Sequence, residues 1–269
     1  MSLSKHTSWS SQINPYNMAQ IAFITGASSG IGAACARKFA QNGYTLLLNA
    51  RNTEKLQALQ EELQAAYGIA VVLLPFDVRD REAAAHALKQ LPEEYQAIDV
   101  LVNNAGLALG IDKEYEGSEE NYDTMIETNI TALLMMTRLV VPNMVARGKG
   151  HIINIGSVAG DAAYPGGSVY CATKAAVKVL SDGLRMDLVD TPLRVTNVKP
   201  GLVETNFSVT RFGGDKERAD KVYQGIKPLT GEDIAEVVYF AASAPAHVQI
   251  AEVLVLATHQ ASGSLVYRS

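Results

Sequence analysis

The sequence has little of what several classes of protein require. Only two of its 269 residues are cysteines, Cys35 and Cys171, and both fall in or at the start of stretches that are expected to be helical. Two isolated thiols of this kind are typical of free, buried or half-buried cysteines in a reducing compartment, so no disulfide is expected. The five histidines are dispersed and no paired-cysteine spacing occurs, so no metal site is expected either.

The chain also lacks a strong charge bias. It carries 23 basic and 28 acidic side chains, for a net charge of -5, and its Lys and Arg residues are scattered. No basic surface of the kind that binds nucleic acid is therefore expected. Residues 1–17 are polar and serine-rich with no apolar run, which argues against a signal peptide or membrane span and predicts a flexible N-terminal arm on a cytoplasmic protein. The sequence leaves open whether this arm is native or precedes an alternative start at Met18.

Low-complexity tracts, internal repeats and Pro- or Gly-rich linkers are absent as well. With 48% hydrophobic residues, residues 18–269 are long enough to form one large domain with a buried core. Short runs rich in Val, Ile and Leu alternate with longer amphipathic stretches, a pattern typical of a parallel sheet with helices on both faces. The sequence thus predicts a single doubly wound, Rossmann-type α/β domain with a seven-stranded parallel sheet.

The periodicity also predicts where the strands and helices lie. Strands are expected at Gln20–Thr25, Tyr44–Asn49, Val71–Pro75, Ile98–Val102, His151–Ser157, Arg194–Lys199 and Ala251–Leu256. Helices are expected at Ile31–Asn42, Thr53–Tyr67, Arg79–Leu91, Ser118–Arg147, Val169–Val189 and Gly231–Ser243, with Thr53, Asp80 and Ser118 as candidate N-terminal caps. The charged segment 207–224 interrupts the alternation after the sixth strand. Because it would lie over the carboxyl ends of the strands, it is a candidate substrate lid.

A glycine-rich loop follows the first strand and opens directly into a helix. Its sequence is Thr25-Gly26-Ala27-Ser28-Ser29-Gly30-Ile31-Gly32. Gly26 permits a tight turn, Gly30 lets the backbone approach a pyrophosphate, and Gly32 lets helix and strand pack closely. An ordinary strand-to-helix turn is the alternative for the glycines alone. Their position after a strand favours a dinucleotide-binding loop, with Ser28, Ser29 and Ile31 also at the ligand.

Two further motifs fall on the same carboxyl edge of the sheet. Asp77-Val78 follows the third strand, and Asn103-Asn104-Ala105-Gly106 ends the fourth. Alone, Asp77 reads as a helix cap and the asparagines as a turn. Because a cofactor laid along this edge would meet both motifs, we assign Asp77, Val78, Asn103, Ala105 and Gly106 to cofactor binding.

The most specific pattern is Tyr170-Cys171-Ala172-Thr173-Lys174, with Ser157 at the end of the preceding strand. Tyr170 and Lys174, at i and i+4, share one face of a helix. A phenol with a pKa near 10 is a poor base at neutral pH unless a cation such as Lys174 favours the phenolate. Ser157 can then hold a substrate oxygen while Tyr170 gives or takes the proton, an arrangement suited to hydride transfer.

Together these residues resemble the classical short-chain dehydrogenase/reductase family, from about Ala19 to the C-terminus. The resemblance implies that Asn129 completes a tetrad with Ser157, Tyr170 and Lys174 and helps to hold a proton-relay water. It also gives meaning to Lys199-Pro200-Gly201-Leu202-Val203-Glu204-Thr205. In this family, residues that match Pro200, Gly201, Val203 and Thr205 border or contact the nicotinamide part of the cofactor.

Charge at the end of the second strand bears on which nicotinamide cofactor binds. A carboxylate there would hold a ribose 2′-hydroxyl and repel a 2′-phosphate. This chain has Asn49-Ala50-Arg51-Asn52 instead, and Arg51 can grip a phosphate in a forked contact. We therefore expect NADP, although the glycine loop lacks an extra basic residue and a merely solvated Arg51 is the alternative.

Several segments resemble one subgroup, the NADP-dependent 3-hydroxy acid dehydrogenases that act on serine, allo-threonine and related acids. They are Asn154-Ile155-Gly156-Ser157-Val158-Ala159-Gly160, Tyr164-Pro165-Gly166-Gly167, Arg211-Phe212-Gly213-Gly214-Asp215 and Pro245-Ala246-His247-Val248. A broad carbonyl reductase and a non-catalytic NADP(H)-sensing protein remain as alternatives. The resemblance also implies a homotetramer built from the helices Ser118–Arg147 and Val169–Val189 and the last strand.

A substrate that carries an acid group needs a cation beside it, because a buried unpaired carboxylate is costly. Arg211, in the candidate lid, is the expected partner, since a guanidinium can hold a carboxylate with two parallel hydrogen bonds. Lys216, Arg218 and Lys221 share the same polar segment. Arg211 could therefore instead be solvated or lie at a subunit contact.

Overall fold

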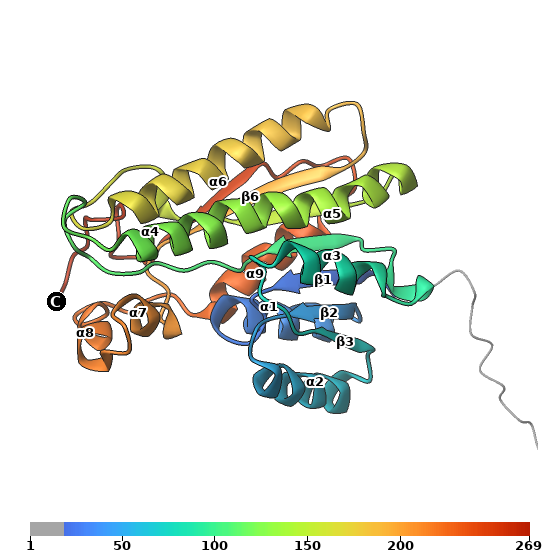
Figure 1. The fold of residues 1–269 in the computed structure, drawn as a ribbon, viewed down its shortest axis with the longest axis horizontal. Coiled ribbons are helices and arrows are strands. Elements are labelled where there is room, and N and C mark those ends of the chain that lie inside the picture. The colour runs from blue at the N-terminus through green and yellow to red at the C-terminus, as the bar shows by residue number, and fades with distance from the viewer. Residues whose placement is uncertain (1–18) are drawn as a thin grey trace, which may run out of the picture.

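A seven-stranded, all-parallel sheet forms the centre of the molecule in the computed structural model, which describes residues 19–269 (Figure 1). The strands are β1 (Ile21–Thr25), β2 (Thr45–Asn49), β3 (Val71–Leu74), β4 (Val100–Asn103), β5 (His151–Ile155), β6 (Arg194–Pro200) and β7 (Glu252–Val255). Their order in the sheet is β3-β2-β1-β4-β5-β6-β7. The order reverses between β1 and β4, and the crevice at such a switch point is where open α/β sheets bind ligands.

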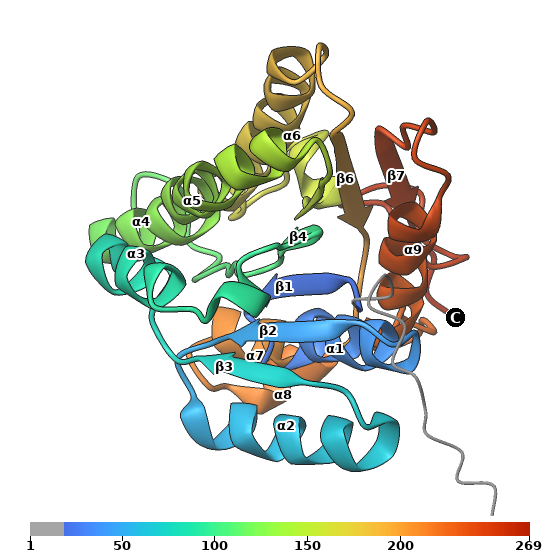
Figure 2. The ribbon, with the colours of Figure 1, turned by 90° about the vertical axis from the view of Figure 1, so that its right-hand side faces the viewer.

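Helices cover both faces of the sheet, so the expected doubly wound fold is confirmed. One face carries α1 (Gly30–Gln41), α2 (Thr53–Tyr67) and α9 (Gly231–Ser243). The other carries α3 (Arg81–Lys89), α4 (Glu119–Ile126), α5 (Ala132–Arg147) and α6 (Ser168–Asp187), as Figure 2 shows. Two short 3-10 turns, Glu93–Tyr95 (η1) and Val158–Gly160 (η3), complete this part of the chain. β1 and β5 are buried along their whole length, as the apolar runs predicted.

The expected helix Ser118–Arg147 is continuous but contains a π turn, η2 (Glu127–Thr131), between α4 and α5. The extra residue of a π turn rotates the helix face, and Thr128 and Asn129 become buried there. By length and composition this run is apolar enough to cross a membrane, with a mean hydropathy of 1.3, but 44% of that window is buried in the fold. The high hydropathy of this run therefore reflects a core helix with an apolar inner face.

Two of the three predicted N-terminal helix caps are found, and the third lies one residue earlier than predicted. The side chains of Asp80 and Ser118 accept hydrogen bonds from Ala83 and Asn121 nitrogens, as expected. Thr53, by contrast, is the first residue of α2, and Asn52 is its cap. The prediction for Thr53 was wrong by one position because two good capping residues stand side by side.

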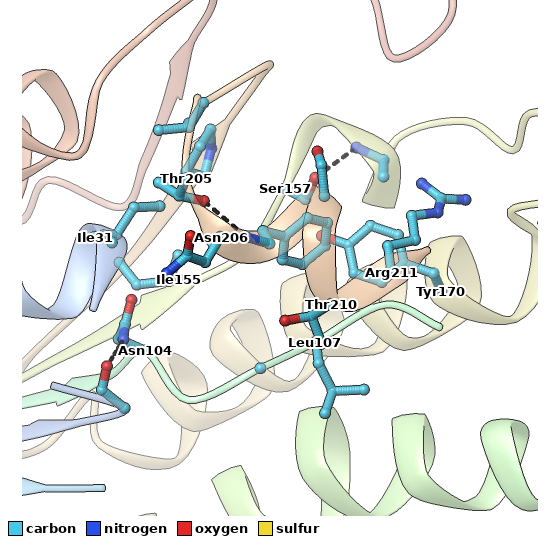
Figure 3. A pocket seen from close by; sticks show the side chains of 18 of the residues that line it. Ile31, Asn104, Leu107, Ile155, Ser157, Tyr170, Thr205, Asn206, Thr210 and Arg211 are labelled. Carbon is cyan, nitrogen blue, oxygen red and sulfur yellow. Dashed lines mark hydrogen bonds between the residues drawn. The ribbon is translucent and has the colours of Figure 1, made fainter. Parts of the chain in front are cut away.

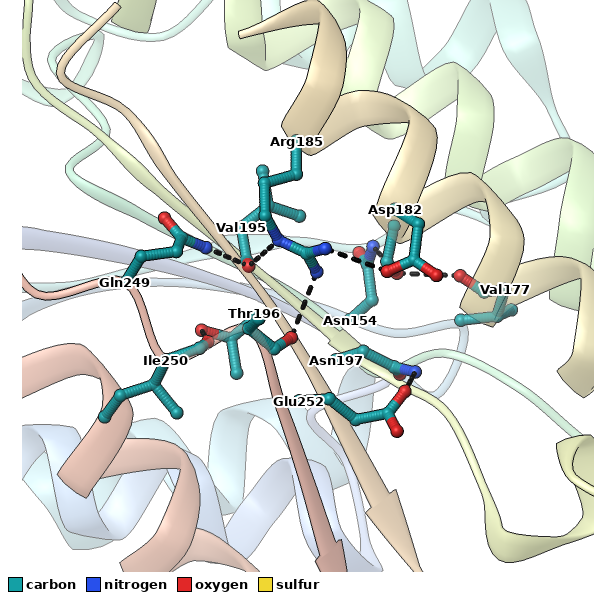
Figure 4. A network of polar contacts seen from close by, with 12 residues as sticks. Asn154, Val177, Asp182, Arg185, Val195, Thr196, Asn197, Gln249, Ile250 and Glu252 are labelled. Atoms are coloured by element: carbon teal, nitrogen blue, oxygen red, sulfur yellow. Dashed lines mark hydrogen bonds and ion pairs between the residues drawn. The ribbon is translucent and has the colours of Figure 1, made fainter. Parts of the chain in front are cut away.

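Side-chain hydrogen bonds tie α6 to the far edge of the sheet. Arg185 on α6 pairs with Asp182 at 2.8 Å and donates to the carbonyl oxygens of Val195 at 3.3 Å and Ala251 at 3.1 Å (Figure 4). Asn154 on β5 donates to Ser181 on α6 at 2.9 Å. These contacts fix how α6 lies against β5, β6 and β7.

Both cysteines are buried, as expected. The expected N-terminal arm, residues 1–17, lies outside the described residues.

Candidate active site

A cavity of about 980 Å³ lies at the carboxyl ends of the strands, at the switch point of the sheet (Figure 3). Its lining comes from the loops that follow β1 to β6, from the start of α6 and from the region after β6. It holds most of the residues expected to act in binding or catalysis. At one end are Ser28, Ser29, Gly30, Ile31, Arg51, Asp77 and Val78, and at the other Ser157, Tyr170, Lys174, Pro200, Gly201, Val203, Thr205 and Arg211, with Gly26, Ala105 and Gly106 between.

The glycine loop has the backbone that its sequence predicts. Gly26 and Gly30 have φ values of +66° and +53°, which L side chains rarely adopt. A Cβ on Gly26 would lie 2.9 Å from Asn104 Nδ2, and one on Gly32 would strike the Gly26 carbonyl. The glycines therefore let the loop turn tightly and pack on Asn104 before the N-terminus of α1, whose N–H groups attract anions. Gly32 packs beneath the loop and does not line the cavity.

The two asparagines after β4 have separate places. The Asn104 amide donates to the carbonyls of Thr25 at 2.8 Å and Gly26 at 3.2 Å, and so fastens the glycine loop to the end of β4. Asn103 points into the sheet, where its amide donates to Asn154 at 2.9 Å. The cavity is lined by Asn104, which the motif contained but the site prediction omitted, and not by Asn103.

Charged groups gather at the end of the cavity beside β2 and β3. Arg51 is 68% exposed and lies 3.8 Å from an Asp77 oxygen. Arg79 grips the same carboxylate at 2.8 Å, and this hydrogen bond lowers the pKa of Asp77. Arg79 also lines the cavity, although the sequence analysis did not single it out. Two guanidinium groups and one carboxylate therefore face this end.

Ser157, Tyr170 and Lys174 meet at the other end. Ser157 caps the 3-10 turn η3, and its Oγ accepts a hydrogen bond from the Ala159 nitrogen at 3.1 Å, which leaves its proton free to donate. Tyr170 is buried in the first turn of α6. Lys174, one turn later, donates to the Ile155 carbonyl at 2.8 Å and lies 6.0 Å from the centre of the Tyr170 ring.

The electrostatics differ from the sequence-based expectation. Burial raises the pKa of Tyr170, while the hydrogen bond from Ser157 and the charge of Arg211 act in the opposite direction. Burial also lowers the pKa of Lys174 to about 8. The expected lowering of the Tyr170 pKa by Lys174 is thus not found here, because Lys174 points to a backbone carbonyl and desolvation dominates.

Asn129 lies behind the wall of the cavity, within the π turn. Its Oδ1 accepts from the Leu107 nitrogen at 2.9 Å, and its amide donates to the Leu107 carbonyl at 2.8 Å and to Thr173 at 3.0 Å. A Cβ on Gly106 would lie 3.2 Å from Asn129 Oδ1 and 3.4 Å from Lys174 Nζ. Asn129 therefore joins the chain after β4 to α6 close to Lys174.

The segment 207–224 is not a plain loop. Most of it forms two short helices, α7 (Asn206–Arg211) and α8 (Lys216–Lys221), and Thr205 caps α7. The Phe207 ring lies 5.6 Å from that of Tyr170, and α7 forms part of the cavity wall. The chain's last residues, among them Gln260 and Arg268, also line the cavity, and no sequence signal pointed to them.

Arg211 is engaged by the protein on three sides. Its guanidinium donates to Gly110 O at 3.1 Å, Tyr164 Oη at 2.9 Å and Gly166 O at 3.4 Å. Because a guanidinium has five N–H donors, these three hydrogen bonds do not use all of them. Of the four cations predicted for the lid, Arg211 lines this cavity, whereas Lys216, Arg218 and Lys221 do not. This geometry excludes a freely solvated Arg211.

Comparison with known proteins matches these features. The family model for short chain dehydrogenases matches residues 20–215. The chain belongs to the short-chain dehydrogenase family. It is 46% identical over 246 residues, 91% of this chain and 95% of the relative, to the NADP-dependent 3-hydroxy acid dehydrogenase of Schizosaccharomyces pombe. It is 48% identical over 251 residues, 93% of this chain and 100% of the relative, to that of Salmonella typhi.

A solved structure of this short-chain dehydrogenase family has the same fold. It is the closed form of serine dehydrogenase complexed with NADP+, which is 45% identical, has a TM-score of 0.87, and aligns over 93% of this chain and 100% of its own. The family resemblance found in the sequence is therefore confirmed.

Proposed function

We propose that this short-chain dehydrogenase transfers a hydride between NADP(H) and a small 3-hydroxy acid, such as serine or allo-threonine, or the corresponding carbonyl compound. The observation that carries the proposal is one cavity with a dinucleotide loop at one end and Ser157, Tyr170 and Lys174 at the other. The names of the relatives support the reaction and the cofactor.

The residues present fit a dinucleotide. The positive φ values of Gly26 and Gly30 shape the loop around the start of α1, and the N–H groups there suit a diphosphate. Arg51, exposed at the end of β2, would hold the 2′-phosphate of NADP, and Asp77 with Val78 would border the adenosine. Pro200, Gly201, Val203 and Thr205 would border the nicotinamide, which when bound supplies the hydride acceptor or donor.

The chain's own groups then handle the proton. Ser157 donates a hydrogen bond to the substrate oxygen, because its Oγ already accepts from Ala159. In oxidation Tyr170 Oη takes the hydroxyl proton, and in reduction it returns one to the carbonyl oxygen. Lys174, with a pKa of about 8, is largely protonated at neutral pH and favours the ionised Tyr170 once its ammonium turns toward it. Asn129 holds the backbone at Leu107 and so shapes the space beside Lys174.

Arg211 is the proposed partner of the substrate carboxylate. It lines the cavity, and its charge reaches the surroundings of Tyr170, because it opposes the rise in the pKa of that phenol. Its bonds to Gly110 and Tyr164 also hold α7 down, so the segment 207–224 would act as a lid that carries a substrate contact.

A broad carbonyl reductase is the second candidate. The apolar wall formed by Leu107, Ile111 and Phe207 favours it, since such a surface also accepts uncharged ketones. A non-catalytic NADP(H) sensor has no such support, because it needs no proton relay.

We further propose a cytoplasmic homotetramer. Exposed apolar side chains lie on the helices and the strand named for its interfaces: Leu134 and Val145 on α5, Val179 and Met186 on α6, and Leu254 on β7. Such faces are commonly buried in closed symmetric assemblies. Light scattering at micromolar concentration tests the assembly, and a monomeric mass would reject it.

A substrate panel tests the proposed reaction. NADPH absorbance is followed as it rises with 3-hydroxy acids and uncharged secondary alcohols and, in the reverse direction, as it falls with aldehydes. We expect the highest kcat/KM with 3-hydroxy acids. Equal turnover of uncharged alcohols would favour the broad reductase.

A further inference from the structure

One buried lysine takes no part in the mechanism above. Lys199 is the last residue but one of β6, directly before the Pro200-Gly201 turn, and its side chain is 5% exposed. Its ammonium lies 2.9 Å from Asp161 and 2.6 Å from Glu252. Asp161 is also 3.3 Å from Lys178 on α6. Four alternating charges, here called the charge ladder (Lys178, Asp161, Lys199 and Glu252), thus run from α6 across β6 to β7.

Asp161 stands at one end of the turn whose other end is Ser157. Between them lies η3, closed by hydrogen bonds from Gly160 N to Ser157 O at 3.0 Å and from Asp161 N to Val158 O at 3.1 Å. The turn also rests on α6, since a Cβ on Gly160 would lie 2.7 Å from the Lys174 carbonyl. Because the turn is short and internally bonded, displacement of Asp161 also displaces Ser157.

Lys199 also supports the residue that precedes this turn. A Cβ on Gly156, just before Ser157, would lie 3.2 Å from Lys199 Cγ and would strike Asn197 Oδ1. The aliphatic stem of Lys199 therefore packs beneath Gly156 while its ammonium holds Asp161. Both ends of the segment that carries Ser157 thus depend on one side chain.

The far end of the ladder is anchored to the edge of the sheet. Glu252 on β7 accepts a hydrogen bond from Asn197 on β6 at 3.2 Å (Figure 4). Burial alone would lower the pKa of Lys199, but its hydrogen bonds to Glu252 and Asp161 outweigh burial and raise it. Burial alone would raise the pKa of Asp161, but Lys199 and Lys178 outweigh burial and lower it. Lys199 therefore remains charged and Asp161 ionised at neutral pH.

We propose that Lys199 is a positioning residue that sets the place of the Ser157 hydroxyl relative to Tyr170, acting through Asp161. The inference rests on the proposed function, in which these two hydroxyls share the substrate oxygen. Reacting groups must be held closely, and a displacement of about 1 Å can cost about a hundredfold in rate. The Lys199 side chain is 5% exposed, so loss of Asp161 leaves a buried ammonium with one partner fewer and releases the end of the turn that it held.

Asp161 and Glu252 form a matched pair for the test. Each carboxylate forms an ion pair with Lys199, and the two side chains are similarly exposed, at 31% and 33%. Asp161→Asn and Glu252→Gln each remove one charge and one ion pair to Lys199. Asp161→Asn also removes the surface pair with Lys178, which contributes little to stability. Of the two carboxylates, only Asp161 belongs to the serine turn. Both variants should lower the melting temperature by similar amounts. We expect Asp161→Asn to lower kcat about 10- to 100-fold, with KM and the NADPH dissociation constant nearly unchanged. Glu252→Gln should keep most of kcat.

Two further variants complete the experiment. Lys199→Met should reproduce the kcat loss of Asp161→Asn, and NADPH binding, followed by fluorescence, shows whether it is folded. If Lys199→Met does not fold, the comparison between Asp161→Asn and Glu252→Gln still decides. Equal kcat losses in those two variants, or an unchanged kcat in Asp161→Asn, would overturn the inference. Ser157→Ala distinguishes failure of the proposed function from failure of this inference. If Ser157→Ala retains turnover, the proposed function fails. If Ser157→Ala is inactive while Asp161→Asn and Lys199→Met keep the wild-type kcat, only the role of Lys199 fails.

Discussion

Replacement of Arg211 separates recognition of the substrate acid from closure of the lid. Arg211→Leu removes the proposed carboxylate partner together with the hydrogen bonds to Gly110, Tyr164 and Gly166. An unpaired carboxylate in the cavity costs about 2–4 kcal/mol, which corresponds to a loss of about 30- to 900-fold in kcat/KM for a 3-hydroxy acid. For an uncharged alcohol only the lid contacts are lost, and each such hydrogen bond contributes about 0.5–1.5 kcal/mol.

Tyr164→Phe is the matched control. It removes the 2.9 Å hydrogen bond to Arg211 but keeps the guanidinium and the aromatic ring beneath it, whose centre is 5.4 Å away. We expect it to lower kcat/KM for acids and alcohols alike, by less than about tenfold. The assay is NADPH absorbance with both substrate types. An equal loss on acids and alcohols in Arg211→Leu would refute carboxylate recognition and leave Arg211 only its role in the lid.

Two further predictions concern cofactor choice and acid stability. Arg51→Asp should shift the ratio of kcat/KM values from NADP toward NAD, because it removes a cation near the 2′-phosphate and adds a carboxylate that can hold a ribose hydroxyl. An unchanged ratio would mean that Arg51 is merely solvated. His151 is buried beside Thr196, and burial lowers its pKa to about 3 from 6.5, so the folded state binds its proton less readily than the unfolded state. Its contribution to the free energy of unfolding is therefore complete above pH 6.5 and is lost as the pH falls toward 3, by at most about 1.4 kcal/mol per pH unit. Urea denaturation of the wild type and of His151→Gln at several pH values measures this, and parallel curves would contradict it.

The sequence predicted the fold well where the physical signal is local. Buried parallel strands such as β1 and β5 appear as short apolar runs, and the glycines at 26 and 30 mark positive φ values that the turn requires. The i, i+4 spacing of Tyr170 and Lys174 likewise places both on one face of α6. These features needed no knowledge of distant contacts.

Other features depend on contacts between distant segments. The π turn at Glu127–Thr131 has no local marker and becomes visible when Asn129 is seen bonded to Leu107 and Thr173. The short helices α7 and α8 pack on the cavity, and their few residues gave no clear period. The bonds of Arg211 to Gly110 and Gly166 join residues far apart in the chain, so these contacts could not be foreseen.

The return of the C-terminal residues to the cavity has no sequence signal either. Gln260 accepts a hydrogen bond from the Leu202 nitrogen at 2.8 Å, and a Cβ on Gly201 would strike it. Arg79 was missed for a different reason: its pairing with Asp77, two residues earlier, is local, but the sequence does not show that its side chain lines the cavity. In both cases the tertiary structure decides which polar side chain faces the cavity.

The central claim is that Tyr170 moves the proton that accompanies hydride transfer, and Tyr170→Phe tests it most directly. The substitution removes one oxygen and keeps the ring that packs against Phe207. Steady-state turnover by NADPH absorbance should fall by about 10² to 10⁴, the usual contribution of acid–base catalysis. NADPH binding, measured by fluorescence titration, should stay within a few-fold of wild type. Turnover close to wild type in this variant, with NADPH binding intact, would contradict the account.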